Sequence, residues 1–216
     1  MKERSDHLKH SIIRIICPHC QKRCSSMASA CSRCGEPLTP MKDTSDAQTN
    51  LELLTERDTE LKFVRELERT IHISIPQVKS LKRNKVGFEM REEKVIGLSL
   101  YKCKLKKLPD LIFTSMTSIR KLYLRRNDIS VLPGSIQRLE DLRHLDLSIN
   151  KLKTLPKKLG LLSRLKELTL SSNTLFDLPK TIGNLLNLEI LNLSNNKLKS
   201  IPNSIGNLKI LKRLYL

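Results

Sequence analysis

A spacing of 23 residues, repeated along the C-terminal half of the chain, restricts the possible fold more than any other feature. The recurring positions are Leu122, Leu145, Leu168, Leu191 and Leu214; Asn127, Asn150, Asn173 and Asn196; and Pro133, Pro156, Pro179 and Pro202. An upstream copy with Leu98, Cys103 and Pro109 lies 24 residues earlier, and we place its extra residue between Ile112 and Met116. A fixed period of this length is typical of a chain that stacks similar turns into a solenoid.

Each unit reads LxxLxLxxNxLxxLPxxIxxLxx, and its first part predicts one short strand per turn. Side chains alternate between the two faces of a strand, so Leu122 and Leu124 are expected to point inward. Lys121, Tyr123 and Arg125 are then expected to point outward. Because every unit repeats the pattern, the strands should lie side by side in one parallel sheet.

The polar and proline positions of the unit also have predicted roles. The asparagine follows the strand, where its amide can satisfy backbone groups of adjacent turns that would otherwise be buried and unpaired. Cys103 occupies this position in the first unit, and a small buried thiol there indicates a structural role. The proline predicts an extended return path, and the Ile or Leu three residues later should refill the core.

The stretch LPKTIGNLLNLEILNLSNNKLKSIPNSIGNLKIL resembles the leucine-rich repeat family, most closely the 23-residue intracellular class of Ras-suppressor-like and plant disease-resistance-like proteins. The resemblance covers residues 95–216 as five full units and a truncated sixth. It implies an α/β fold, a curved solenoid with a parallel sheet on its concave face, on which other proteins dock. The chain ends at Leu216, inside the strand of the sixth unit and without a terminal cap, so we expect it to be a fragment.

Residues 51–94 are predicted to form a helix and the N-terminal cap of the solenoid, the cap being helical and β-hairpin in character. The helix would start after Asn50 as N-cap. Its apolar stripe comprises Leu51, Leu54, Leu61, Val64 and Leu67. The segment GFEMREEKVIGLSL predicts a strand, a charged turn near Glu92 and Glu93, and the first repeat strand. Residues 39–50 are polar and aperiodic, which is typical of a linker.

Residues 1–38 contain the spacing C-x2-C-x10-C-x2-C, as CPHC followed by CSRC. The four cysteines are Cys17, Cys20, Cys31 and Cys34. Two thiolate pairs suit the closed tetrahedral sites of structural Zn²⁺, and binding would supply folding energy to a segment too short for its own core. The segment resembles a zinc ribbon, except that Gln21 stands where that family usually has Gly. A disulfide framework would suit a secreted chain, and whether Cys24 ever acts as a ligand stays open.

Charge and composition restrict the classes of function that we expect for this chain. The net charge is +18, and residues 95–216 contribute +14 of it, from 22 Lys and Arg against 8 Asp and Glu. No apolar run approaches the roughly 18 residues that would cross a bilayer, so we expect no membrane insertion and a cytoplasmic location. Phosphate-loop, GxSxG and HExxH motifs are missing from the sequence, which predicts that the chain is not an enzyme.

These observations favour a non-enzymatic protein-interaction scaffold or adaptor, with the zinc ribbon as a second module. Candidate protein-binding residues on the concave face are Tyr101, Tyr123, Arg125, Arg126, His144 and Asp146, since Tyr and Arg are enriched at binding hot spots. His144 and Asp146 resemble an acid–base pair, but the pattern implies no nucleophile beside them. The alternative is a nucleic-acid-associated protein that binds through the ribbon and the basic surface. The identity of the partner and the oligomeric state stay open.

Overall fold

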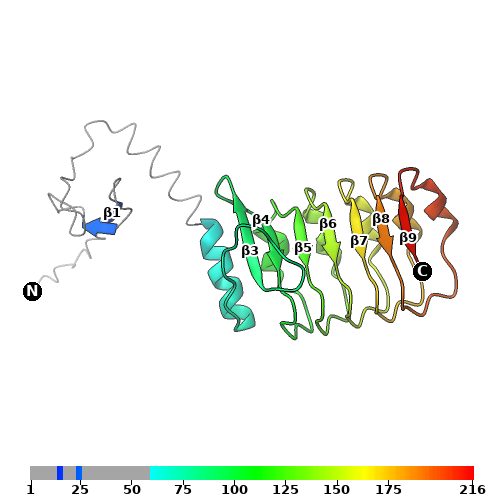
Figure 1. Cartoon of the computed structure of the whole chain (residues 1–216), viewed down its shortest axis with the longest axis horizontal. Helices are drawn as coiled ribbons and strands as arrows, with labels where there is room; N and C mark the ends of the chain where they lie inside the picture. Colours follow the sequence, from blue (N-terminus) through cyan, green and yellow to red (C-terminus); the bar gives the residue numbers. More distant parts are fainter. Residues whose placement is uncertain (1–13, 17–22, 26–58) are drawn as a thin grey trace, which may run out of the picture. The chain divides into compact units, whose positions relative to one another are not determined.

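A computed structural model describes residues 14–16, 23–25 and 59–216 of the chain (Figure 1). The chain divides into two compact units, Met1–Glu52 and Leu53–Leu216. The first contains the cysteine-rich segment and the second contains the repeats.

The smaller unit contains one antiparallel pair of strands, β1 (Arg14–Ile16) and β2 (Arg23–Ser25), in which Ile15 lies opposite Cys24. β1 directly precedes the CPHC pair in the sequence. The predicted zinc ligands lie outside the described residues, as does the predicted linker 39–50; these ligands are Cys17, Cys20, Cys31 and Cys34.

The larger unit is built on a seven-stranded sheet in the order β3-β4-β5-β6-β7-β8-β9. The strands are β3 (Gly87–Arg91), β4 (Lys94–Ser99), β5 (Lys121–Tyr123), β6 (His144–Asp146), β7 (Glu167–Thr169), β8 (Ile190–Asn192) and β9 (Arg213–Tyr215). β3 pairs with β4 in antiparallel fashion, and all later neighbours are parallel. Leu122 and Leu124 are fully buried and Lys121 is half-buried, as the predicted alternation requires. Tyr123 is also buried, at 6% exposed, although it lies at an outward position.

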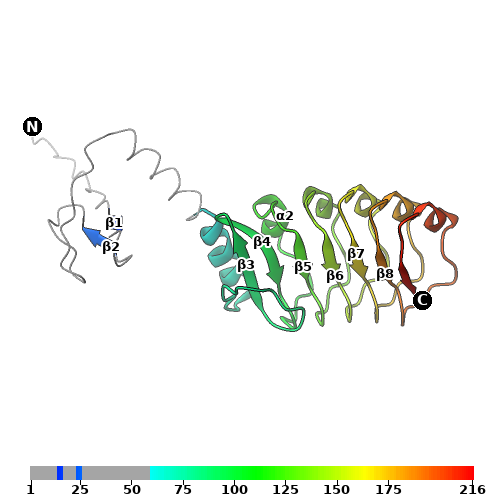
Figure 2. The same ribbon diagram turned by 45° about the horizontal axis from the view of Figure 1, so that its top comes forward.

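Short helical turns cover the other side of the sheet (Figure 2). They are α2 (Leu111–Thr114) and the 3₁₀ helices η1 (Gly134–Arg138), η2 (Lys157–Leu161), η3 (Lys180–Asn184) and η4 (Asn203–Asn207). An extended proline precedes each 3₁₀ helix, with Pro133 at φ −71° and ψ 152°, which confirms the predicted return path. The 24-residue unit instead has the α-helical turn α2, which uses 3.6 residues per turn rather than 3.0, at the predicted site of the extra residue.

The asparagine positions hold adjacent turns together as the sequence predicts. The Asn150 amide donates to the Leu124 carbonyl oxygen at 2.9 Å in the preceding turn and to the Leu147 carbonyl oxygen at 3.0 Å in its own. Its Oδ1 accepts from the Ile129 N–H at 3.1 Å. Equivalent bonds are made by Asn127, Asn173 and Asn196.

Cys103, which replaces the asparagine in the first unit, is 7% exposed, and its Sγ lies 3.6 Å from the Tyr101 carbonyl oxygen. Burial raises the pKa of the Cys103 thiol to about 11, so the side chain is a neutral thiol at physiological pH. The predicted structural role of Cys103 agrees with this environment.

A helix, described over residues 59–71, and the β3–β4 hairpin precede the repeats. Val64 and Leu67 of the helix belong to the same apolar core as Leu98 of β4. The buried Glu60 carboxylate accepts a hydrogen bond from the Val95 N–H at 3.1 Å, a contact that the apolar stripe did not predict. The predicted strand, charged turn and strand are present; the expected start of the helix at Asn50 lies outside the described residues.

Two glycines mark the closest approach between helical turns. A Cβ added at Gly160 would collide with the Thr181 carbonyl oxygen of the next turn, and one added at Gly183 would collide with that of Ser204. Gly206 has the same position in its unit, but nothing lies within 4 Å of an added Cβ there.

We therefore predict that Gly160→Ala lowers the free energy of unfolding by about 1–3 kcal/mol, because the added methyl group forces backbone apart in a packed core. Urea denaturation followed by circular dichroism measures this change. Gly206→Ala is the matched control and should change the free energy by less than about 0.5 kcal/mol. Equal losses in the two variants would contradict the close approach at Gly160 as the cause.

Candidate functional site

The outward side chains of the sheet form one surface, which we call the strand face, because the strands place equivalent positions side by side. One row comprises Lys121, His144, Glu167, Ile190 and Arg213, and the next comprises Tyr123, Asp146, Thr169, Asn192 and Tyr215. The register predicted from the 23-residue period is therefore confirmed in the four parallel pairs from β5 to β9, and β4 pairs with β5 at the 24-residue offset of the first unit.

The strand face is hollowed into a groove of about 510 Å³ over strands β5 to β9. Its lining comprises Arg83, Asn84, Arg125, Asp146, Glu167, Thr169, Ser171, Ile190, Asn192, Arg213 and Tyr215. Small polar side chains such as Thr169, Ser171 and Asn192 line it together with longer arginines. Such a surface offers donors and acceptors to a ligand that lies across the strands.

Arg83 enters this groove from the loop before β3. Its Nη2 lies 2.5 Å from Glu167 Oε2, and its guanidinium carbon lies 5.2 Å from the centre of the Tyr123 ring. Tyr123, one of the predicted binding residues, is consequently only 6% exposed, and burial raises the pKa of its phenol. Sequence reasoning missed Arg83, since the loop lies outside the repeat register and carries no motif.

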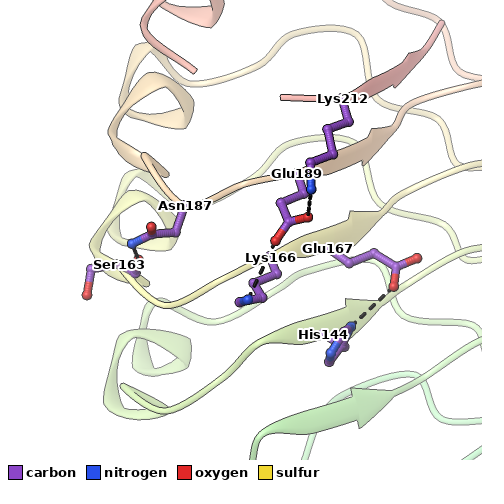
Figure 3. Close-up of polar contacts among 7 residues, drawn as sticks. All are labelled: His144, Ser163, Lys166, Glu167, Asn187, Glu189 and Lys212. Carbon is purple, nitrogen blue, oxygen red and sulfur yellow. Dashed lines mark hydrogen bonds and ion pairs between the residues drawn. The ribbon is translucent and has the colours of Figure 1, made fainter. Parts of the chain in front are cut away.

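Glu167 is the electrostatic centre of the groove. The His144 Nδ1 lies 3.2 Å from Glu167 Oε2 (Figure 3), on the same oxygen that Arg83 contacts. The hydrogen bond with His144, together with the hydrogen bond and positive charge of Arg83, lowers the pKa of Glu167 to about 2 against the opposing effect of burial. The carboxylate is therefore held ionised, and its Oε2 is shared by Arg83 and His144.

His144 and Asp146 do not act as a pair. Asp146 is 2% exposed, and its Oδ1 accepts hydrogen bonds from the backbone N–H of Ser148 at 2.9 Å and from its hydroxyl at 2.6 Å. His144 instead faces Glu167. The arrangement stabilises the strand ends and provides no proton relay between these two residues.

Of the remaining predicted binding residues, Arg125 lines the groove, whereas Arg126 and Tyr101 lie outside its lining. Arg125 lines the groove, where its Nη1 donates to the Ser148 hydroxyl at 3.1 Å. Arg126 Nη1 donates to the Tyr101 hydroxyl at 3.4 Å and lowers the pKa of that phenol, and neither residue lines the groove. Arg125 and Asp146 are thus the predicted binding residues that the groove brings together.

A second row of polar contacts ties the turns together beside the groove (Figure 3). Glu189 lies between Lys212, at 2.6 Å, and Lys166, at 3.5 Å, and the hydrogen bond from Lys212 lowers the pKa of Glu189. Asn187 Nδ2 donates to the Ser163 carbonyl oxygen at 2.8 Å. These ion pairs are exposed, so each contributes little to stability.

Two further kinds of site can be assessed in the part of the chain that the structure describes. No group of three or more His, Cys, Asp or Glu residues there is arranged to hold a metal ion. None of the helices described there has the length and apolar character needed to cross a membrane.

The repeats are the part of this chain that matches a known protein family. The family model for the leucine rich repeat matches residues 97–152 and 163–216. Among solved structures, the leucine-rich repeat ectodomain of the plant membrane receptor kinase GASSHO1/SCHENGEN3 from Arabidopsis thaliana, in complex with CASPARIAN STRIP INTEGRITY FACTOR 2, is 30% identical over 50% of this chain, with a TM-score of 0.46. An internalin from Listeria monocytogenes is 27% identical over 51% of this chain, with a TM-score of 0.44.

The matched regions are 13% of the plant chain and 32% of the bacterial chain, so this chain spans less than two thirds of either. No match was found among curated proteins.

The position of Glu167 predicts a pH dependence of stability. The pKa of Glu167 is about 2 in the folded state, below its ordinary value of 4.5. The stabilisation of the folded state by Glu167 is therefore present above pH 4.5 and is lost as the pH falls towards 2. Between pH 5 and pH 2.5 the wild-type free energy of unfolding should fall by about 1–2 kcal/mol more than that of Glu167→Gln. Urea denaturation at both pH values measures the difference.

Glu140→Gln is the control, since Glu140 is an exposed carboxylate without an ion pair among the described residues. That variant should keep the wild-type pH dependence. The same loss of stability in the wild type and in Glu167→Gln would contradict the proposed role of Glu167.

Proposed function

The chain belongs to the leucine-rich repeat family, and from this premise we propose that it is a non-enzymatic scaffold or adaptor that docks a protein partner in the groove of the strand face. Domains of this family commonly mediate protein–protein interaction. The observation that carries the proposal is the groove itself, which presents unused donors and acceptors on a rigid sheet.

The chemistry of the groove supports binding over catalysis. Asp146 is buried and hydrogen-bonded to Ser148, and Glu167 is held by Arg83 and His144. Neither carboxylate that lines the groove is therefore free to transfer a proton to a ligand. The Ser and Thr hydroxyls of the lining can still form hydrogen bonds with a peptide backbone.

We predict that blocking the groove abolishes partner binding. Ser171 is half-buried in the lining, and Ser171→Tyr places a neutral ring across the path of a ligand. Random twelve-residue peptides displayed on phage should yield binders of the wild-type protein that lose at least about tenfold in affinity for Ser171→Tyr, because the added side chain occupies their site.

Thr154→Tyr adds the same ring at an exposed position outside the groove and should bind the selected peptides as the wild type does. Melting temperatures of both variants establish that they are folded. Binders that are insensitive to Ser171→Tyr would place the docking surface elsewhere on the protein.

We further propose that residues 1–38 form a zinc-ribbon module that serves as a second interaction element. The antiparallel pairing of β1 with β2 supports this, because residues 17–22, including Cys17 and Cys20, connect two adjacent strands. When bound, Zn²⁺ would be a structural ion held by Cys17, Cys20, Cys31 and Cys34. A cytoplasmic location, where thiols stay reduced, and membership of the 23-residue intracellular class belong to the same proposal.

Zinc content tests the module. The wild-type protein should contain one zinc ion per chain, and Cys17→Ser should contain little or none, since a four-thiolate site loses a ligand. Elemental analysis by mass spectrometry gives the stoichiometry. Cys24→Ser is the matched control and should keep the ion; loss of zinc in this variant would instead make Cys24 a ligand.

A further inference from the structure

The groove has a charge imbalance that its own residues do not remove. Of its two acidic side chains, Glu167 pairs with Arg83 and His144, and Asp146 accepts hydrogen bonds from the neutral Ser148. Among the residues that the structure describes, no carboxylate pairs with the other two cations of the lining, Arg125 and Arg213.

Arg125 is poorly satisfied for a half-buried cation. Of its five N–H donors, the described residues provide one hydrogen bond, to the neutral Ser148 hydroxyl. The guanidinium of Arg213 is exposed and has no side-chain partner among the described residues. A planar guanidinium in this state is suited to bidentate pairing with a carboxylate.

The sheet determines the spacing of these two arginines. Arg125 lies two residues after the end of β5, whereas Arg213 is the first residue of β9, four strands away. Arg213 lies in the row of Lys121, four residues before Arg125. The two arginines are therefore about 19 Å apart across the strands and about 13 Å apart along them, which gives a diagonal of about 23 Å. An extended peptide covers this distance in about seven residues, at about 3.3 Å each. Side chains an even number of residues apart point to the same side of such a peptide, so spacings of six or eight residues fit the two arginines.

We infer that the partner segment is an extended acidic peptide with two carboxylate side chains six or eight residues apart, one bound to Arg125 and the other to Arg213. The inference rests on the proposed function and names the chemistry of the partner at the same groove. The lining contains no lysine and a single aromatic ring, that of Tyr215, which is a poor platform for stacked nucleic-acid bases. The charges therefore favour a carboxylate peptide over a nucleic acid.

The test uses the full chain and a fluorescein-labelled ten-residue peptide of alternating glutamate and threonine, titrated by fluorescence anisotropy at 150 mM salt. Arg125→Gln and Arg213→Gln should each weaken binding about tenfold, since each removes one charge-assisted bidentate contact. Lys153→Gln removes the same charge at an exposed position outside the groove and should change the affinity less than twofold. Circular dichroism shows that each variant is folded.

Three results would overturn the inference: no binding of the acidic peptide, equal weakening by Lys153→Gln, or tighter binding of a ten-nucleotide single-stranded DNA that depends on the same arginines. The phage selection separates this inference from the proposed function. Peptides that are sensitive to Ser171→Tyr but lack the acidic pair would leave the docking function in place and refute its acidic chemistry. Recovery of no such peptide would refute the docking function itself.

Discussion

The asparagine ladder is the interaction on which the rest of the solenoid depends. Each turn leaves the sheet through backbone that is buried against its neighbours, and buried carbonyl and amide groups must be paired. The amide of Asn150 pairs with two carbonyl oxygens and one N–H from two successive turns. Because this geometry recurs at Asn127, Asn173 and Asn196, adjacent turns are held at one constant offset. That offset sets the spacing of the strands and hence the width of the groove.

Because the offset between turns is constant, all turns can share the same core packing while their outward side chains differ. Inward leucines and isoleucines fill every turn, so the outward positions are free to vary from unit to unit. The groove differs along its length for this reason: His144 and Glu167 interact on adjacent strands, Ile190 follows, and Arg213 ends the row. In the proposed docking function, recognition would be determined by these outward residues and not by the inward side chains that fill the core.

The sequence predicted the repeating part of the structure because its physical constraints repeat. Strand positions, buried leucines, the asparagine bonds and the extended prolines all follow from the 23-residue period. The contact of Arg83 with Glu167 was not predictable, since it joins residues 84 positions apart through a loop outside the period. The burial of Tyr123 beneath Arg83 and the bond from Val95 to Glu60 have the same origin. Periodicity determines where an outward residue lies, and the non-repeating flank determines whether it is accessible.

The distribution of charge then assigns different roles to the lysines and to the arginines of the groove. The lysines lie outside the groove lining, so they contribute to the long-range field of the protein, which is screened within about 8 Å at physiological salt. Such a field increases the rate of encounter with an anionic partner and does not select its position. Arg125 and Arg213 lie inside the groove, where a carboxylate would lose water and gain directional hydrogen bonds. Affinity that depends on these two arginines is therefore separable from the attraction due to net charge, because only the first requires a defined spacing in the ligand.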